Sequence, residues 1–211
     1  MRVGAVILGA GSSSRLGTPK QLLQFRGGSL LRNAALAALG AGCSPVVVVT
    51  GAYAGLARRE VDGLAVRVVW NARWASGLAS SVRAGVRGLF EVDPSADAVV
   101  LLLCDQPHVT ASVVSGLVST HRATGRLVVA SSYGGSVGVP ALFSREVFGE
   151  LAALQGAEGA KQVIARHASA SHFVPFPGGE LDVDTPDDVA RLRAADSPAA
   201  GDTVPGELTH K

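Results

Sequence analysis

A run of small residues near the start of the chain carries two cationic side chains. The segment from Leu8 to Lys20 reads Leu-Gly-Ala-Gly-Ser-Ser-Ser-Arg-Leu-Gly-Thr-Pro-Lys. Small residues let backbone N–H groups approach a phosphate closely, and hydroxyl groups add further donors. Arg15 and Lys20 would supply positive charge on flexible stems. The segment therefore predicts a phosphate-binding loop.

Two well-known phosphate-binding motifs do not fit this loop. A dinucleotide-binding fingerprint needs a third glycine where Ser14 stands, and an acidic residue after the second predicted strand, where the sequence is Thr50-Gly51-Ala52. A Walker A loop needs four residues between its two glycines and then Lys-Ser/Thr, whereas five residues separate Gly11 from Gly17 and Thr18 follows. A polar turn with incidental charge is the simpler alternative.

Aspartates stand at two further positions that could face a ligand. Asp105 directly follows an uncharged apolar run over 98–104. A carboxylate buried there without a partner would be costly, so a hard cation is its natural partner. Asp182 and Asp184 point to the same side if their segment is extended. Both carboxylates could then face the same ligand.

Short apolar runs alternate with stretches of helical spacing, which indicates an α/β fold. Continuously apolar runs are typical of strands covered on both faces, and strand–helix alternation implies a mainly parallel sheet. In such a sheet, ligands bind beyond the carboxyl ends of the strands, where the loop after Leu8 and Asp105 both lie. The predicted strands are 3–8, 46–50, 66–70, 98–103 and 127–131, and the predicted helices are 30–39, 78–90 and 113–122.

The pattern changes after Ser132. The predicted segments there are a glycine-rich loop over 134–140, short helices over 145–154 and 160–167, and a strand over 173–176. Thr185 and Pro186 predict the N-cap and first residue of a last helix, with Asp187 and Asp188 in its first turn.

The composition indicates one compact domain. The chain has 211 residues, of which 47% are hydrophobic and 17% charged. Such values favour a folded core over disorder. Residues 197–211 lack apolar periodicity, so we predict a domain over 1–196 and a disordered C-terminal tail over 197–211.

Charge and cysteine content exclude several classes of protein. The chain has 19 basic and 17 acidic residues, a net charge of +2 that gives no overall field for binding nucleic acid or a membrane surface. The apolar runs are too short for a membrane span or a signal peptide, so a cytoplasmic protein is expected. Cys43 and Cys104 are too few for a disulfide framework or a four-ligand zinc site, and are expected to be small buried side chains.

Four motifs, taken in chain order, resemble those of the molybdenum cofactor cytidylyltransferases and related nucleotidyltransferases. The 8–20 loop is similar to their Leu-Ala-Ala/Gly-Gly…Arg-Met-Gly…Lys signature, with Gly9 and Leu16 as conservative departures. The segment from Asn71 through Trp74 and Gly77 to Ser81 resembles Asn-x-x-Trp-x-x-Gly-Met-x-x-Ser. The last two matches are Leu-Leu-Cys-Asp-Gln-Pro at 102–107 and Asp-x-Asp-Thr-Pro at 182–186.

This resemblance implies a three-layer, Rossmann-like nucleotidyltransferase with a mainly parallel central sheet. It implies Mg²⁺ on Asp105 and Asp184, and charge neutralisation of a triphosphate by Arg15 and Lys20, so that Arg15, Lys20 and Asp105 are the catalytic residues. Ala10 favours CTP, because the guanylyl branch usually has Gly-Gly there. The nucleotide-binding residues that it implies are Leu8, Gly9, Ala10, Gly11, Ser12, Ser13, Arg15, Lys20, Asn71, Ser80 and Ser81. The alternative for the Asn71–Ser81 segment is a core tryptophan followed by helix-capping serines.

The implied reaction transfers CMP to a phosphorylated, pterin-type acceptor such as molybdopterin and releases pyrophosphate. A molybdenum hydroxylase or dehydrogenase is the implied protein partner. Two departures fall in the acceptor half, where Val139 replaces the histidine of Gly-His-Pro and Lys161 replaces an arginine. The alternatives are an NAD(P)H-dependent reductase similar to nicotine blue oxidoreductase and a non-catalytic cofactor chaperone. Neither of these needs a metal-binding pair of carboxylates.

Overall fold

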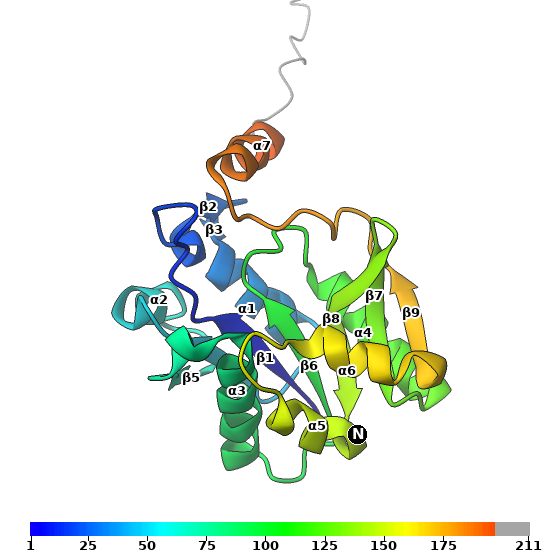
Figure 1. Cartoon of the computed structure of the whole chain (residues 1–211). Coiled ribbons are helices and arrows are strands. Elements are labelled where there is room, and N and C mark those ends of the chain that lie inside the picture. Colours follow the sequence, from blue (N-terminus) through cyan, green and yellow to red (C-terminus); the bar gives the residue numbers. More distant parts are fainter. Residues whose placement is uncertain (197–211) are drawn as a thin grey trace, which may run out of the picture.

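The computed structural model describes residues 1–196 of the chain, so the tail predicted over 197–211 lies outside the described residues. A seven-stranded sheet in the order β5-β4-β1-β6-β8-β7-β9 forms the centre of the molecule (Figure 1). Its strands are β1 (Val3–Gly9), β4 (Val46–Thr50), β5 (Arg67–Trp70), β6 (Ala98–Leu103), β7 (Val128–Tyr133), β8 (Ser136–Ser144) and β9 (Ser171–Pro175).

The pairing of the strands confirms the mainly parallel sheet. The central strand β1 pairs in parallel with β4 and β6, and Ile7 lies opposite both Val48 and Leu102. Strand β5 continues the parallel set beyond β4. Within the described residues, β8 alone runs against the other strands of this sheet, because it pairs antiparallel with β6 and β7 while β9 is parallel to β7.

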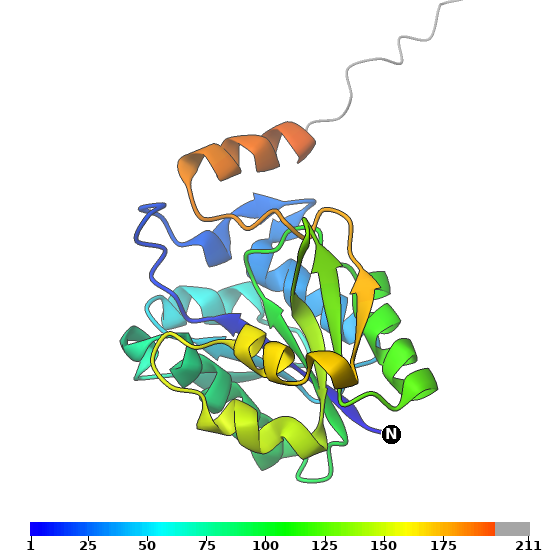
Figure 2. The ribbon, with the colours of Figure 1, turned by 45° about the vertical axis from the view of Figure 1, so that its right-hand side comes forward.

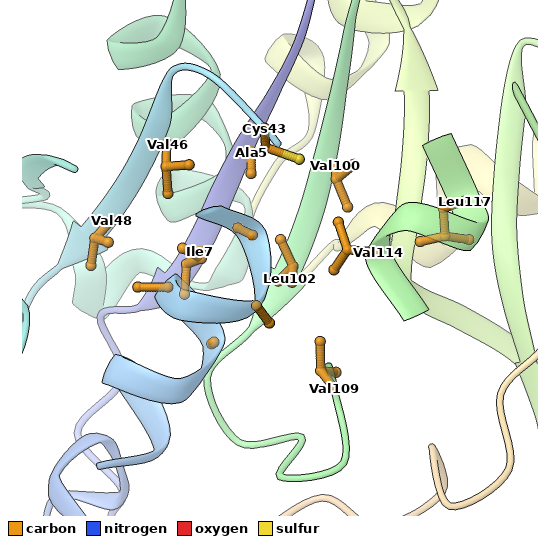
Figure 3. Close-up of a cluster of buried hydrophobic side chains, with 14 of the residues drawn as sticks. Ala5, Ile7, Cys43, Val46, Val48, Val100, Leu102, Val109, Val114 and Leu117 are labelled. Carbon is orange, nitrogen blue, oxygen red and sulfur yellow. The ribbon is translucent and has the colours of Figure 1, made fainter. Parts of the chain in front are cut away.

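Helices cover both faces of the sheet, which gives the three layers that the resemblance implies (Figure 1). Side chains alternate between the two faces along each strand, so Ile7 and Val6 enter different cores. Figure 3 shows part of the first core, where Ala5, Ile7, Val46, Val48, Val100 and Leu102 from the strands lie near Val114 and Leu117. Helices α1 (Leu30–Gly40), α2 (Ala54–Glu60) and α4 (Ala111–Thr124) pack on this face, and α3 (Leu78–Val92), α5 (Phe148–Ala153) and α6 (Ala160–Arg166) on the other.

Local signals explain where the longer helices begin and end. The Ser29 hydroxyl accepts a hydrogen bond from the Arg32 N–H at 3.2 Å and caps α1. Thr110 caps α4 in the same way, and Gly125 ends that helix with a left-handed φ of 64°. Cys43 and Cys104 are both buried, as expected.

The glycine-rich loop predicted over 134–140 is wrong. Gly134 and Gly135 form a tight turn with φ of 53° and 71°, and β8 begins directly after it. The strand runs through Pro140, which has no N–H for the sheet ladder. A shift in the β7–β8 register between Ala141 and Gly138 accommodates this residue.

The sequence pattern did not predict α2 or the short strands β2 (Gln24–Phe25) and β3 (Gly28–Ser29), and the remaining differences lie at element boundaries. The helix predicted over 145–154 is divided into a 3₁₀ turn, η3 (Arg145–Val147), and α5. The strand predicted over 173–176 is β9, which begins two residues and ends one residue earlier than predicted. No helix in residues 1–196 combines the length and apolar character needed to cross a membrane.

A small substructure lies beyond the carboxyl ends of the parallel strands. The hairpin of β2 (Gln24–Phe25) and β3 (Gly28–Ser29) packs beside the last helix, α7 (Pro186–Asp196), as Figure 2 shows. A separate apolar cluster joins them through Phe25, Leu30, Val183 and Leu192. The predicted start of α7 is confirmed, because the Thr185 Oγ1 accepts from the Asp188 N–H at 3.3 Å.

Candidate active site

A cavity of about 320 Å³ opens at the carboxyl ends of β1 and β6. The phosphate-binding loop predicted after β1 forms one wall, and the start of α3 with the turn before it, η2 (Trp74–Ser76), forms another. The lining residues are Leu8, Gly9, Ala10, Gly11, Ser12, Lys20, Gln21, Trp74, Ala75, Gly77, Leu78, Ser81, Leu103, Cys104 and Asp105. The cavity therefore lies where a parallel sheet is expected to bind its ligand.

Gln21, which the sequence analysis did not identify, holds the loop in shape. Its fully buried side chain donates to the Gly9 carbonyl at 3.0 Å and to the Gly11 carbonyl at 2.7 Å. The Tyr53 hydroxyl donates to the Ser12 carbonyl at 3.1 Å. Because the side chains of Gln21 and Tyr53 hold several of its carbonyl groups, the loop keeps a defined course around the cavity.

Close approach between backbones shapes the same wall. A side chain at Gly51 would meet the Ala10 carbonyl oxygen at 2.5 Å and the Cβ of Trp74 at 2.7 Å. The glycine at this position therefore lets the loop, the end of β4 and the Trp74 ring pack against one another.

Lys20 joins the two aspartates that were predicted to bind a metal. Its ammonium group donates a hydrogen bond to Asp105 Oδ2 and a second one, of 2.8 Å, to Asp184 Oδ1. Arg15 Nη2 contacts the other oxygen of Asp184 at 2.7 Å. The structure thus brings Arg15, Lys20, Asp105 and Asp184 together in one charged cluster, although they are up to 169 positions apart.

The cluster shifts the ionisation of its members. Burial opposes the charge of Lys20, but attraction to Asp105 and hydrogen bonds to Asp105 and Asp184 outweigh it and raise the lysine pKa. Burial disfavours the charged form of Asp184, yet the bond and charge of Lys20, followed by Arg15, lower its pKa. Partial desolvation and the charges of Asp105 and Asp184 raise the pKa of Asp182 to about 6. Near neutral pH, Lys20 and Asp184 are therefore both charged.

Backbone contacts place the two carboxylates. Asp105 follows β6, and the N–H of its neighbour Cys104 bonds to the Leu8 carbonyl at 3.3 Å. The Val183 N–H donates to the Asp105 carbonyl at 3.0 Å, which ties the segment carrying Asp184 to the end of β6. Burial and the negative charge of Asp105 raise the pKa of Cys104 to about 12, so its thiol stays neutral.

The donor set suits a hard divalent cation that takes most of its ligands from a substrate. Asp105 Oδ1 is buried and has no hydrogen-bond partner among the described residues. No group of three or more His, Cys, Asp or Glu side chains within residues 1–196 could hold a metal by itself. Mg²⁺ is commonly bound by one or two carboxylates together with substrate phosphates, and Asp105 and Asp184 fit that pattern.

Of the three nucleotide-binding residues predicted in the segment after β5, only Ser81 lines the cavity, next to Trp74. Asn71 is buried behind them and donates to the Ser80 and Ser81 hydroxyls at 2.8 and 3.0 Å. The Ser80 hydroxyl donates to backbone carbonyls of the preceding turn. Asn71 and Ser80 thus hold the start of α3 in place.

A second chain segment closes over the start of α3. The Gly156 carbonyl accepts from the Ala79 N–H at 3.2 Å, so this N–H of the first turn has a partner within the protein. A side chain on Gly77 would meet the Gly156 oxygen at 2.1 Å, and the φ of Gly77 is +108°. Glycine is required here on both counts.

A second cavity, of about 280 Å³, adjoins the first and shares Leu8, Leu78 and Leu103 with it. Lys161 and Asp182 supply its charged groups. The Lys161 ammonium donates to the Ser136 hydroxyl at 2.9 Å. The two departures noted in the acceptor half, Val139 and Lys161, both line this second cavity.

The predicted site residues therefore divide into three groups. Those lining the first cavity are Leu8, Gly9, Ala10, Gly11, Ser12, Lys20, Ser81 and Asp105. Arg15 and Asp184 join it through the charged cluster. Ser13, Asn71 and Ser80 do not line it; the Ser13 hydroxyl accepts from the Lys20 N–H at 3.0 Å. Gln21 and Trp74 were not among the predicted site residues.

Comparison with known proteins agrees with this geometry. Rv0371c of Mycobacterium tuberculosis H37Rv is 34% identical, with a TM-score of 0.76 over 90% of this chain and 96% of that one. A structure of Rv0371c in complex with manganese gives 32% identity and a TM-score of 0.72, over 91% and 98% of the chains. Nicotine blue oxidoreductase of Paenarthrobacter nicotinovorans is 36% identical over 121 residues, which is 57% of this chain and 57% of that protein.

The family model of the MobA-like NTP transferase domain matches residues 5–171, which include the loop, the cavity walls and Asp105. This match covers most of the chain, and the loop after β1 and Asp105 line the same cavity. The fold and the NTP transferase family are therefore identified together. The chain belongs to the family of MobA-like NTP transferase domains.

Proposed function

We propose that this protein transfers CMP from CTP to a phosphorylated acceptor of the molybdopterin type and releases pyrophosphate. The observation that carries the proposal is the contact of one ammonium group, that of Lys20, with both Asp105 and Asp184. Two carboxylates that share one cation beside a glycine-rich loop are suited to hold a metal–triphosphate complex.

The reaction asks for positioning and charge neutralisation more than for covalent chemistry. A phosphate oxygen of the acceptor forms a bond to the α-phosphorus of CTP, and the bond from that phosphorus to the bridging oxygen breaks, with pyrophosphate leaving with the electron pair. The attacking phosphate is already ionised near neutral pH, so no strong general base is required. Arg15 and Lys20 would neutralise charge on the triphosphate and the departing pyrophosphate.

Asp105 and Asp184 would hold Mg²⁺ in this scheme. When bound, the ion neutralises phosphate charge and orients the triphosphate for in-line attack. The manganese complex of the relative Rv0371c supports a divalent cation in this family. The buried, unpartnered Oδ1 of Asp105 supports the same assignment.

The remaining cavity residues suit the nucleoside and the acceptor. Ala10 lines the first cavity and is typical of the cytidylyl branch of the family. Ser81 offers a hydroxyl group there, and Trp74 an aromatic surface. The adjoining second cavity, with Lys161 as a cation, is the place for the acceptor.

Pyrophosphate release tests the proposal. The protein is incubated with Mg²⁺, a molybdopterin-type acceptor and CTP, GTP or ATP in turn. We expect release with CTP that stops when Mg²⁺ is chelated. An absence of release with every triphosphate would count against nucleotidyl transfer.

A second candidate function is hydride transfer from NAD(P)H, because nicotine blue oxidoreductase is 36% identical over 57% of this chain. A thermal-shift panel of CTP, GTP, ATP, NADH and NADPH, each with and without Mg²⁺, separates the two. We expect stabilisation by one triphosphate that depends on the metal. Stabilisation by NADH or NADPH alone, without metal, would favour the reductase.

A further inference from the structure

Lys20 satisfies the two carboxylates that a divalent cation would need. Its ammonium contacts Asp105 Oδ2 and Asp184 Oδ1, and Arg15 contacts the second oxygen of Asp184. Of the four carboxylate oxygens, three are therefore engaged by cationic side chains. The fourth, Asp105 Oδ1, is buried and has no partner within residues 1–196.

A divalent cation cannot bind both carboxylates while Lys20 stays between them. The ammonium and the metal would compete for Asp105 and Asp184, and they would repel each other at that range. The Lys20 side chain is only 16% exposed, so water screens this repulsion weakly. A cation entering alone has to displace the ammonium and leave it without an anionic partner.

The fold gives Lys20 a second place to go. Its backbone N–H is bonded to the Ser13 hydroxyl, so its main chain is fixed next to the phosphate-binding loop. Its side chain is a flexible four-carbon stem, and it lines the same cavity as Gly9 and Gly11. A triphosphate seated on that loop would offer the ammonium new anionic partners.

We infer that the Lys20 ammonium stands in the place of the divalent cation between Asp105 and Asp184 until a triphosphate draws it away. The protein alone then binds the cation weakly, and cation and triphosphate raise each other's affinity. In this role Lys20 is a positioning residue that keeps the two carboxylates together. The inference rests on the proposed function, because it takes a triphosphate as the second ligand.

Mn²⁺ binding tests the inference without any turnover. The paramagnetic signal of free Mn²⁺ in solution is followed as wild-type protein, Lys20→Met and the control Lys161→Met are titrated in. Lys161 is the matched control because it is the other lysine of residues 1–196 and donates to a neutral hydroxyl group. The titrations are repeated with CTP, with the binding of Mn²⁺ to CTP measured separately and subtracted.

We expect Lys20→Met to bind Mn²⁺ more tightly than wild type in the absence of CTP, by on the order of tenfold. We expect CTP to tighten Mn²⁺ binding of the wild type by a similar factor, and to do so much less in Lys20→Met. Lys161→Met should bind Mn²⁺ as wild type does, both with and without CTP. Weaker or unchanged Mn²⁺ binding by Lys20→Met would overturn the inference.

Two further measurements keep the outcomes distinct. If Lys20→Met fails to fold, as judged by its thermal transition, Lys20→Gln takes its place. Wild-type protein that binds Mn²⁺ equally well with and without CTP would overturn the inference by itself. If Lys20→Met binds Mn²⁺ tenfold more tightly but the wild-type protein releases no pyrophosphate from any triphosphate, the role of Lys20 is sustained and the proposed reaction is rejected.

Discussion

At the scale of single residues, the site depends on a few polar atoms whose partners are fixed. Lys20 bridges Asp105 and Asp184, and Gln21 next to it bridges two loop carbonyls. These two consecutive residues therefore serve different parts of the site, because Lys20 contacts the charged cluster and Gln21 holds the loop. Losing either side chain should have a different consequence, because Lys20 holds the charged cluster together and Gln21 holds the shape of the loop.

Removal of charge at Asp105 or Lys20 should abolish most activity. We expect Asp105→Asn and Lys20→Ala each to lower kcat by on the order of 10²–10³-fold, because each loses an electrostatic contact between mostly buried side chains. Steady-state pyrophosphate release measures the loss. Asp62→Asn, an exposed position outside the cavity, is the matched control and should keep wild-type kcat. Near-normal turnover by Asp105→Asn would contradict its role.

Gln21 should matter to stability as well as to nucleotide binding. We expect Gln21→Met to lower the free energy of unfolding by about 1–3 kcal/mol, because the variant loses hydrogen bonds to Gly9 and Gly11 in the protein interior. It should also raise the KM for the nucleotide. Urea unfolding gives the first quantity. Gln24→Met, at an exposed neighbouring position, should leave both unchanged, and equal behaviour of the two variants would refute the assignment.

The charged residues of the site could be predicted from the sequence, but their supports could not. Arg15, Lys20, Asp105 and Asp184 stand in motifs whose chemistry is readable residue by residue. Gln21 has no such signal, because a glutamine acts here only through carbonyl groups that the folded loop turns toward it. Asn71 belongs to a readable motif, yet its amide faces the serines of α3 and not the cavity.

At the scale of elements, the C-terminal helix completes a site built by the first half of the chain. Asp184 lies just before α7, and α7 is held by the β2–β3 hairpin through Leu192 and Phe25. The hairpin in turn follows the turn η1 (Lys20–Leu22), which carries Lys20. The two partners of the Lys20–Asp184 contact are therefore joined a second time, through an apolar cluster away from the cavity.

Weakening this cluster should reduce activity from a distance. We expect Leu192→Ala to cost about 2–3 kcal/mol of stability through the cavity it leaves, since Leu192 is 1% exposed. Turnover should fall as well, because Asp184 loses the support that holds it near Lys20. Urea unfolding and pyrophosphate release are measured side by side. Leu36→Ala, at a 45% exposed position, should change neither, and full activity of Leu192→Ala would show that Asp184 is placed without α7.

Elements with a single strong pattern could be predicted, and those with mixed signals could not. The strands predicted from apolar runs over 46–50 and 98–103 have the same bounds as β4 and β6. The first part of β8, up to Pro140, was predicted as a loop because Gly138 and Pro140 lie inside it, and the pairing of the strand depends on a register shift that no local pattern reveals. The β2–β3 hairpin has two-residue strands, which are too short for periodicity to show.

At the scale of the whole molecule, one mainly parallel sheet brings distant motifs together at the carboxyl ends of its parallel strands. The loop after β1, the turn after β5 and Asp105 after β6 meet there because parallel strands end on the same side. The second cavity adjoins the first because β8 returns along β6. This convergence follows from strand–helix alternation, so the location of the site could be predicted even though the path of the chain after Ser132 could not.

An ion pair between α5 and α6 should add a small, pH-dependent contribution to the stability of the fold. Glu150 of α5 contacts His167 and Arg166 at the end of α6, and hydrogen bonds from these residues lower the pKa of Glu150. A carboxyl whose pKa is lowered by folding adds stability that is complete above its unfolded pKa, about 4.3, and is lost as the pH falls through the folded value. Glu150 is 35% exposed, so the contribution is at the small end, about 0.2–1 kcal/mol.

We therefore expect Glu150→Gln to be less stable than wild type at pH 7, and the difference to shrink as the pH falls below about 4.3 toward the lowered pKa of Glu150 in the folded protein. Urea unfolding at pH 7, 5 and 3.5 measures it, with Glu180→Gln, at an exposed position, as the control. A gap of the same size at pH 7 and pH 3.5 would mean that Glu150 stabilises the α5–α6 contact through packing and not through charge.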